Sequence, residues 1–297
     1  MTSPLVFTMP GNEDFGERLV QALGGERGDL SVHVFPDKES LVRLHTAVGR
    51  RDVILVCSLN DPDPKFLPLA FAASTARDLG ARSVGLVAPY LSYMRQDKRF
   101  HKGEAITSVH FARLLGDLVS WLVTVDPHLH RHQSLSEIYS IPTTVVHAAA
   151  PVADWIRVHV PQPVVIGPDA ESEQWVAEVA GLAGAPYRVC RKRRKGDLEV
   201  LISLPDMDAV EGRVPVLVDD IVSSGRTLLE AARLLRESGF AKPFCVAVHF
   251  LAGEETSSAL EREFTQVKST NTILHGTNQI DLTSQIAAAC RPFLNGP

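Results

Sequence analysis

The residues Val216-Leu217-Val218-Asp219-Asp220-Ile221-Val222-Ser223-Ser224-Gly225-Arg226-Thr227 join an apolar run to a leucine-rich segment. The run over 214–218 is typical of a strand buried on both faces. The Leu and Ala pattern over 227–238 predicts an amphipathic helix that stops at Gly239. A strand, two carboxylates, a loop of small hydroxylated residues and a helix thus follow one another directly. This order predicts an α/β fold with its functional loops at the carboxyl ends of parallel strands.

The loop after this strand has the chemistry of a phosphate site. Backbone N–H groups at the start of a helix attract a phosphate through unpaired donors and the helix dipole. Ser223, Ser224 and Thr227 add hydroxyl donors, and Gly225 would let the backbone approach the anion closely. The loop is therefore expected to bind the phosphate of a sugar phosphate.

Asp219 and Asp220 would repel a phosphate if they faced it. At the end of a strand they are better placed to accept hydrogen bonds from ribose hydroxyls or to hold a magnesium ion. The plain alternative is an acidic turn followed by serine caps, a common way to start a helix. The full combination of strand, acidic pair, glycine loop and helix favours the sugar-phosphate site.

The rest of the chain repeats the alternation of strand and helix, which predicts parallel sheets flanked by helices. Strand-like runs lie at 52–56, 83–87, 121–125, 164–166, 214–218 and 244–248, and helical patterns at 67–79, 107–118, 170–183 and 227–238. With 297 residues the chain is long enough for two domains. Turn-forming residues near Pro142 and Pro151 place the boundary so that the domains are 1–146 and 147–297.

Composition narrows the class of protein further. The chain is 45% hydrophobic and 22% charged, with a net charge of −5, which excludes a largely disordered chain and gives no basic field for nucleic acid. The four cysteines are scattered and form no CxxC pair, as expected of reduced thiols in the cytoplasm. No apolar run approaches the length of a membrane span. We therefore expect a cytoplasmic enzyme with neither a nucleic acid nor a membrane partner.

Several further motifs follow one another in a fixed order. They are Phe35-Pro36-Asp37-Lys38-Glu39, the segment from Pro89-Tyr90 to Arg95-Gln96-Asp97, Glu104-Ala105-Ile106-Thr107, Asp126-Pro127-His128, Gly167-Pro168-Asp169 and Arg191-Lys192-Arg193-Arg194. Each resembles a motif of the ribose-phosphate pyrophosphokinases, the phosphoribosyl pyrophosphate (PRPP) synthases. The 216–227 segment resembles the ribose-5-phosphate loop of the phosphoribosyltransferase fold. Motifs in one order across roughly the whole chain argue against chance similarity.

The resemblance implies an α/β fold of two phosphoribosyltransferase-type domains, each a mainly parallel sheet flanked by helices. The first would be the ATP side, and the second would carry the ribose-5-phosphate site and the catalytic loop. The implied reaction transfers the diphosphoryl group of ATP to the C1 hydroxyl of ribose 5-phosphate. It gives PRPP, a precursor in nucleotide biosynthesis, and AMP, and it requires Mg²⁺.

The resemblance also assigns residues to roles, which are collected here by ligand. Lys192 and Arg194 would be catalytic; Phe35, Asp37, Glu39, Arg95, Gln96, Asp97 and His128 would bind ATP; Asp219, Asp220, Ser223, Ser224, Gly225, Arg226 and Thr227 would bind ribose 5-phosphate; and His128 and Asp169 would be associated with the metal. In the family, the residues equivalent to Phe35, Asp37 and Glu39 reach the adenine of a neighbouring subunit. The resemblance therefore implies a homo-oligomer, a dimer or larger.

Some of these residues have simpler interpretations when taken alone. The basic run 191–195 could be a solvated loop. His128, His130 and His132 alternate, but no Cys or carboxylate partner completes a metal site, and only His128 is expected to be functional. The chain also departs from the family: Lys38 and Arg226 stand where glycine is usual, and the stretch after His128 is slightly longer than usual.

Three other functions remain as alternatives. A non-catalytic homologue could assemble with and regulate a true synthase, and an enzyme of the same architecture could act on another sugar phosphate. A plain phosphoribosyltransferase is the least favoured, because its ATP-side motifs would have no use.

Overall fold

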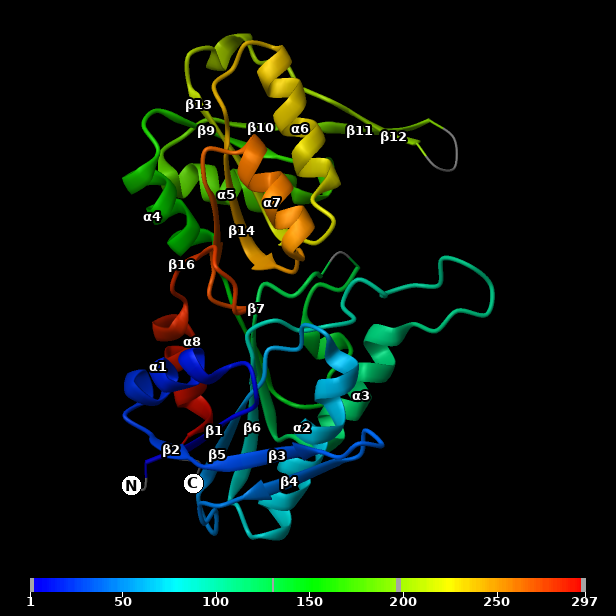
Figure 1. Ribbon diagram of the computed structural model, residues 1–297, viewed down its shortest axis with the longest axis vertical. Helices are drawn as coiled ribbons and strands as arrows, with labels where there is room; N and C mark the ends of the chain where they lie inside the picture. Colours follow the sequence, from blue (N-terminus) through cyan, green and yellow to red (C-terminus); the bar gives the residue numbers. More distant parts are fainter. Residues whose placement is uncertain (1–2, 130, 196–198, 295–297) are drawn as a thin grey trace. The chain divides into compact units, whose positions relative to one another are not determined.

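The computed structural model (Figure 1) describes residues 3–129, 131–195 and 199–294, with side chains throughout these ranges apart from residues 192–201. Contacts divide the chain into two compact units. Unit 1 comprises Met1–Val146, Thr272–Leu274 and Leu282–Pro297, and unit 2 comprises His147–Asn271 and His275–Asp281. The sequence-based domains 1–146 and 147–297 stay a prediction. In the structure, the segment from Leu282 onward belongs to unit 1.

Unit 1 contains a six-stranded sheet in which every pair of neighbouring strands is parallel. Its strands, in spatial order, are β2 (Glu26–Gly28), β1 (Leu5–Thr8), β5 (Asp52–Val56), β6 (Ser83–Ala88), β7 (Trp121–Val125) and β8 (Thr143–Val146). A two-stranded antiparallel hairpin, β3 (Leu30–Val34) and β4 (Ser40–Leu44), precedes β5. The chain places β2 on one side of β1 and β5 on the other, so the strand order reverses between β1 and β5.

Helices cover both faces of this sheet. Apolar residues from α2 (Pro62–Asp78) and α3 (Thr107–Leu118) share one buried core with alternate residues of the strands, among them Leu5 and Phe7 of β1. The intervening Val6 faces the other side, because successive strand residues point to opposite faces. There α1 (Glu13–Leu23) packs against α8 (Thr283–Cys290), as Figure 1 shows. The short 3₁₀ helices η1 (Leu135–Glu137) and η4 (Arg291–Phe293) complete the unit.

Unit 2 repeats this topology with a second all-parallel six-stranded sheet. Its strands, in spatial order, are β10 (Tyr187–Val189), β9 (Pro163–Gly167), β13 (Val214–Val222), β14 (Phe244–Phe250), β15 (Val267–Thr270) and β16 (Asn278–Ile280). The order again reverses beside the first strand of the unit, here between β9 and β13. Two sheets of one topology account for the similar alternation of strand and helix in the two halves of the sequence.

The helices of unit 2 also lie on both faces of the sheet. α6 (Arg226–Glu237) and α7 (Glu254–Glu263) share a core with β9, β13 and β14, and α4 (Ala149–His159) packs against α5 (Glu173–Ala183). An antiparallel ribbon of β11 (Arg191–Lys195) and β12 (Glu199–Ser203) extends beside α6 in Figure 1. The remaining elements are the 3₁₀ helices η2 (Ala170–Ser172) and η3 (Asp208–Val210).

Each unit is completed by the helix that follows the last strand of the other sheet. α4 follows β8 along the chain but packs on α5 in unit 2, and α8 follows β16 but packs on α1, β7 and β8 in unit 1. On α8, Ile286 is fully buried, and the ring of Phe293 in η4 stacks on Trp121 of β7 with centroids 4.8 Å apart. The C-terminal segment is therefore part of the core of unit 1.

The expected strands and helices are confirmed in type, and several differ in extent. The helix expected over 170–183 begins as the 3₁₀ helix η2 and continues as α5 from Glu173. β13 continues through the acidic pair to Val222 because β14 pairs alongside it as far as Phe250. α2 begins at Pro62, before the expected helical pattern, with prolines in its first turn. Proline is tolerated there because the amides of the first turn have no partner within the helix.

None of the helices in the described part of the chain combines the length and the apolar character needed to cross a membrane.

Candidate active site

Three predicted carboxylates lie at the sheet edge where the strand order of unit 2 reverses. Asp169 follows β9, and Asp219 and Asp220 occupy the carboxyl-terminal half of β13, the strand paired with β9. The register places Leu217 opposite Ile166, so both chains run on from this pair to their carboxylates at the same edge of the sheet. In open α/β sheets this edge, at such a reversal, is where ligands bind. All three residues are half-buried.

The loop after β13 presents an uncapped helix start. Ser223 and Ser224 are exposed, and α6 begins at Arg226 with no side-chain cap and no acidic residue in its first turn. By contrast, α7 has Glu254 and Glu255 in its first turn. The unpaired amides and positive dipole end of α6 therefore meet no local carboxylate in that turn, which suits a phosphate ligand. Arg226, exposed at the first helical position, adds a positive charge to this end.

Gly225 lies where α7 packs closely against the loop before α6, a contact that the sequence did not predict. Its φ of +64° lies in the left-handed region. A Cβ at this position would lie 2.9 Å from Thr256 Cγ2 and 3.5 Å from the terminal carbons of Leu260, both on α7. The missing side chain makes room for α7, and the role of this glycine in admitting an anion stays a prediction. The packing of α6 on α7 thus depends on the same residue that turns the loop.

Asp169 combines a structural contact with a position suited to a metal. One carboxylate oxygen accepts a hydrogen bond from the Glu171 amide at 3.1 Å, which caps η2. The buried Cys190 thiol lies near enough for the negative charge of Asp169 to raise its pKa, after the larger effect of burial. The described residues contain no cluster of three or more His, Cys, Asp or Glu side chains able to cage a metal. Mg²⁺ fits such a site, because it is commonly held by one or two carboxylates together with substrate phosphates.

The predicted catalytic residues lie on the β11–β12 ribbon of unit 2. Along the backbone, Lys192 is paired with Ile202 and Arg194 with Val200. The side chains of Lys192 and Arg194 lie outside the described residues, so their assigned roles stay predictions. The basic run 191–195, for which a solvated loop was the simpler interpretation, forms a strand.

On the ATP side, the loop after β6 presents two exposed side chains and one buried carboxylate. Arg95 and Gln96 are exposed, whereas the Asp97 side chain is only 3% exposed. Both oxygens of Asp97 accept hydrogen bonds from Nη1 of Arg131, at 2.7 and 2.9 Å. Arg95 and Gln96 thus lie at the surface of this loop, while the Asp97 carboxylate is paired with Arg131.

His128 lies in the loop after β7 and is half-buried. Further along this loop, His132 Nδ1 lies 2.9 Å from Glu137 Oε2, and the Gln133 amide donates to Glu137 Oε1 at 2.9 Å. These contacts, first the one to His132, lower the pKa of Glu137 below its ordinary value. Hydrogen bonds among its own residues thus stabilise the loop that carries His128. His130 lies outside the described residues.

Phe35, Asp37 and Glu39 lie at the exposed tip of the β3–β4 hairpin. The Phe35 amide donates to the Glu39 carbonyl at 2.8 Å, and Asp37 Oδ1 accepts from the Glu39 amide at 3.1 Å. Lys38 has a φ of +76°, so this position requires the conformation that the family's glycine adopts freely. The hairpin folds the turn that the motif predicts, although it has lysine in place of glycine.

Arg131 is the functional candidate that the sequence analysis missed. It lies in the longer stretch after His128, and 34 residues separate it from its partner Asp97. The unusual length of this loop was the one feature of the sequence that indicated a special role for it. The local sequence does not predict which residue an arginine in a loop will contact.

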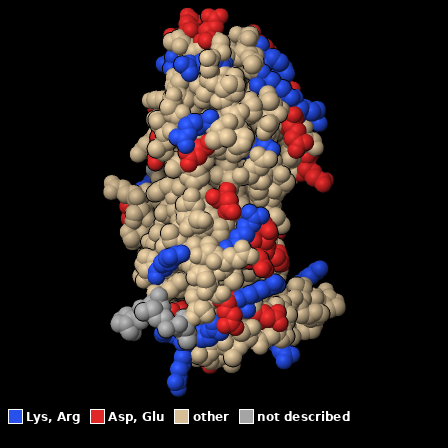
Figure 2. Space-filling view, turned by 90° about the vertical axis from the view of Figure 1, so that its left-hand side faces the viewer, with Lys and Arg blue, Asp and Glu red and all other residues tan. Residues whose placement is uncertain are grey.

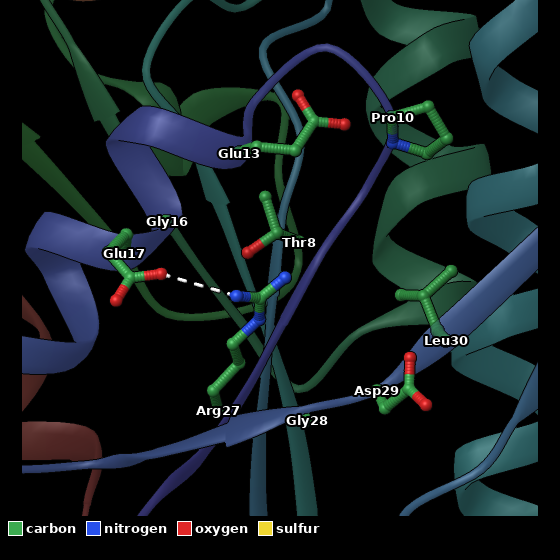
Figure 3. A pocket seen from close by; sticks show the side chains of 9 residues that line it. All are labelled: Thr8, Pro10, Glu13, Gly16, Glu17, Arg27, Gly28, Asp29 and Leu30. Carbon is green, nitrogen blue, oxygen red and sulfur yellow. Dashed lines mark hydrogen bonds and ion pairs between the residues drawn. The ribbon is translucent and has the colours of Figure 1, made fainter.

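A cavity of about 210 Å³ lies between β1, β2 and α1 in unit 1 (Figure 3). It is lined by Thr8, Pro10, Glu13, Gly16, Glu17, Arg27, Gly28, Asp29 and Leu30. Its three carboxylates outnumber its one guanidinium, and Arg27 already pairs with Glu17 at 3.3 Å. This excess of negative charge does not suit a phosphate ligand. None of the site residues predicted from the sequence lines the cavity.

Charges are mixed on the face of the molecule shown in Figure 2, where Lys and Arg side chains are interspersed with Asp and Glu. A surface that follows a nucleic acid backbone carries a continuous basic stripe. The residues coloured on this face do not form such a stripe.

The protein has two parallel sheets, and in each the strand order reverses beside the first strand. One sheet carries an acidic pair just before a helix with no side-chain cap. These features define a protein of two phosphoribosyltransferase-type domains. Two family models match: the N-terminal domain of ribose phosphate pyrophosphokinase over residues 5–118 and the phosphoribosyl transferase domain over residues 134–282. The chain belongs to the ribose-phosphate pyrophosphokinase family.

Individual relatives agree with this assignment. The chain is 32% identical to the ribose-phosphate pyrophosphokinase of Methanopyrus kandleri, over 92% of this chain and 94% of the relative. It is 30% identical to that of Sulfolobus acidocaldarius, over 91% and 94% respectively. The crystal structure of phosphoribosylpyrophosphate synthetase from Mycobacterium smegmatis has the same fold, with a TM-score of 0.85, 21% identity and 98% of each chain covered.

Proposed function

We propose that this protein transfers the diphosphoryl group of ATP to the C1 hydroxyl of ribose 5-phosphate, giving PRPP and AMP in the presence of Mg²⁺. The observation that carries the proposal is the end of β13 in unit 2. There the acidic pair is followed by the start of α6, which has no side-chain cap and no acidic residue in its first turn. Both lie at the edge where the strand order of the sheet reverses. Such an edge can receive an anion and hydroxyl groups at adjacent points.

Ribose 5-phosphate would bind with its phosphate against hydrogen-bond donors and its ribose hydroxyls against carboxylate acceptors. Its phosphate would accept hydrogen bonds from the backbone amides of the loop and of the first turn of α6, and from Ser223, Ser224 and Thr227. The carboxylates of Asp219 and Asp220 would accept hydrogen bonds from the ribose hydroxyls. This arrangement orients the sugar, because a phosphate placed at the acidic end would be repelled.

In the proposed reaction, the C1 oxygen forms a bond to the β-phosphorus of ATP. The bond from that phosphorus to the oxygen bridging to the α-phosphorus breaks, AMP leaves with the bridging oxygen, and the hydroxyl proton is released to water. Arg95 and His128 would contact the phosphates, with Gln96 near the adenine, and Lys192 and Arg194 would stabilise the charge of the diphosphoryl group in transfer. Mg²⁺, when bound, neutralises phosphate charge, and Asp169 and His128 are the residues that the sequence motifs assign to it.

The proposal includes a homo-oligomer and a cytoplasmic location. The hairpin tip with Phe35, Asp37 and Glu39 is exposed, as required if these residues complete the adenine site of a neighbouring subunit. All four cysteines are free and buried, which suits a reducing compartment.

The test is AMP formation from ATP and Mg²⁺, with and without ribose 5-phosphate. Sugar-dependent release of AMP, with no ADP, is expected. Lys192→Ala and Arg194→Ala should each lower kcat by at least about 100-fold with smaller effects on KM, because removing one charge-stabilising group commonly costs this much. Arg191→Ala, on the same strand, is the matched control and should keep nearly full activity. Full turnover in both test variants would refute the assigned roles.

Two alternatives give different results in the same assay. Arg226, where glycine is usual in the family, adds a charge beside the phosphate loop and is the observation that favours another sugar phosphate as acceptor. In that case AMP forms with a different sugar phosphate from a panel and not with ribose 5-phosphate. A regulatory homologue would bind ATP and form no AMP with any of them.

A further inference from the structure

Asp97 is a buried carboxylate whose described partner comes from a different loop. Its side chain is 3% exposed, and both of its oxygens accept hydrogen bonds from Nη1 of Arg131, at 2.7 and 2.9 Å. The Arg131 side chain is 45% exposed, so the pair is buried on the carboxylate side and reaches solvent on the guanidinium side. Charge-assisted hydrogen bonds of this length are among the stronger side-chain contacts in proteins.

This pair links the two loops that carry the ATP-side residues. Asp97 directly follows Gln96 in the loop after β6, and Arg131 follows His128 in the loop after β7. β6 and β7 are parallel neighbours, so both loops leave the same edge of the sheet. The backbone joins them near their base, where the Val125 amide donates to the Pro89 carbonyl at 3.3 Å. Arg131 joins them further out, beside the exposed side chains.

Other contacts hold the Arg95–Asp97 segment from its own side. The Gln96 amide donates to the Tyr93 carbonyl at 3.0 Å, and the Ser108 amide, in the first turn of α3, donates to the Gln96 carbonyl at 3.3 Å. These bonds place the segment relative to its own turn and to α3. The Arg131–Asp97 pair adds a side-chain link from this segment to the His128 loop.

We propose that Arg131 is a positioning residue which, through Asp97, holds the Arg95–Gln96 segment and the His128 loop in the one arrangement that binds ATP. The inference rests on the proposed function, because it concerns the ATP side of that reaction. It assigns Asp97 to the support of the nucleotide site and away from direct contact with the nucleotide. It also gives the longer loop after His128 a purpose, since that loop carries the arginine.

The test compares Arg131→Met, Asp97→Asn and the double variant by steady-state kinetics. Each single variant should raise the KM for ATP about tenfold, which corresponds to ~1.4 kcal/mol. The KM for ribose 5-phosphate and kcat should change less than about threefold, because the sugar site lies on other elements. In the double variant, Arg131→Met should add less than about twofold to the effect of Asp97→Asn, because its partner is already absent. Arg131→Lys, which retains the charge, should recover most of the affinity.

A direct binding measurement separates positioning from loss of folding. Calorimetric titration of the full chain with Mg²⁺ and the non-hydrolysable analogue α,β-methylene-ATP should show the same tenfold weakening in both single variants. Arg157→Met is the matched control, because Arg157 forms a 2.7 Å ion pair with Asp154 on the exposed surface of α4. It should bind the analogue as the wild type does.

Three outcomes would overturn the proposal: an unchanged affinity for ATP in Asp97→Asn, a full effect of Arg131→Met in the Asp97→Asn background, or no recovery with Arg131→Lys. The second would show that Arg131 contacts the nucleotide itself. If Arg131→Met does not fold, the comparison of Asp97→Asn with the double variant still decides between these roles. A wild-type protein that neither binds the analogue nor forms AMP would instead refute the proposed function.

Discussion

Replacing Gly225 by alanine tests whether the loop before α6 is held by packing on α7 as well as by its turn. The residue has a φ of +64°, and an added Cβ would lie 2.9 Å from Thr256 Cγ2. The next contact, to Leu260 at 3.5 Å, is an ordinary van der Waals distance. The substitution therefore combines a strained backbone with one tight contact to a named methyl group.

The expected loss of stability follows from three contributions. Alanine in the left-handed region costs ~1–2 kcal/mol relative to its preferred conformation. The smaller entropy of the unfolded chain returns about 0.4–1 kcal/mol. Crowding Thr256 adds a further cost of ~1–3 kcal/mol, as in other overpacked sites. The free energy of unfolding should therefore fall by roughly 1–4.5 kcal/mol.

Gly239→Ala provides the control for the backbone cost. Gly239 follows α6 with a φ of +83°, and no atom lies within 4 Å of the position that its Cβ would occupy. It should therefore lose only the first two contributions, about 0–1.5 kcal/mol net. Thr256→Ser removes the crowded methyl group, so the double variant Gly225→Ala with Thr256→Ser should recover much of the crowding cost.

Urea unfolding followed by tryptophan fluorescence measures these differences in the full chain. Equal losses for Gly225→Ala and Gly239→Ala, or no recovery in the double variant, would refute the assignment of the crowding to Thr256.

Two other predictions concern the thiols and the C-terminal helix. Burial raises the pKa of the Cys57, Cys190 and Cys290 thiols from 9.0 to about 12 and also raises that of Cys245. The contribution of these neutral thiols to the free energy of unfolding is complete below pH 9 and is lost as the pH rises towards 12. At pH 8, dithionitrobenzoate should label the thiols of the unfolded chain but not those of the native protein. Rapid labelling of the native protein would contradict this prediction. Ile286→Ala on α8 should destabilise unit 1 by ~2–5 kcal/mol, whereas Leu114→Ala, at a 51% exposed position on α3, should change stability by less than ~0.5 kcal/mol. Calorimetry checks both, and equal effects would show that α8 is not part of the core.

Local sequence was sufficient to predict the order of elements around the sugar-phosphate loop. The apolar run before Asp219, the small residues 223–225 and the amphipathic pattern that follows specify strand, loop and helix through interactions between near neighbours. The order of these elements needed no knowledge of distant contacts. The position of Asp169 at the same sheet edge as the acidic pair, by contrast, depends on the pairing of β9 with β13, which are about 50 residues apart along the chain.

Other features depended on partners that are remote along the chain. β13 extends to Val222 because β14 supplies hydrogen-bonding partners, and the size limit at Gly225 arises from Thr256 on another helix. The motif assigns Asp97 to ATP, which stays a prediction, and gives no sign of the pairing with Arg131 that the structure shows. Sequence pattern does not predict such pairs, because a side chain's partner is decided by how the elements pack.

The sequence alone thus determined the fold class, the family and the chemistry of the two candidate binding loops, because periodicity, turn residues and motifs act over short distances. The tertiary structure decided which residues support those loops and which helices complete each core. The clearest case is α8, which follows β16 of unit 2 along the chain but packs on α1, β7 and β8 of unit 1. Hydrophobic burial depends on the area removed from water and not on sequence distance, so only the folded chain shows where that area lies.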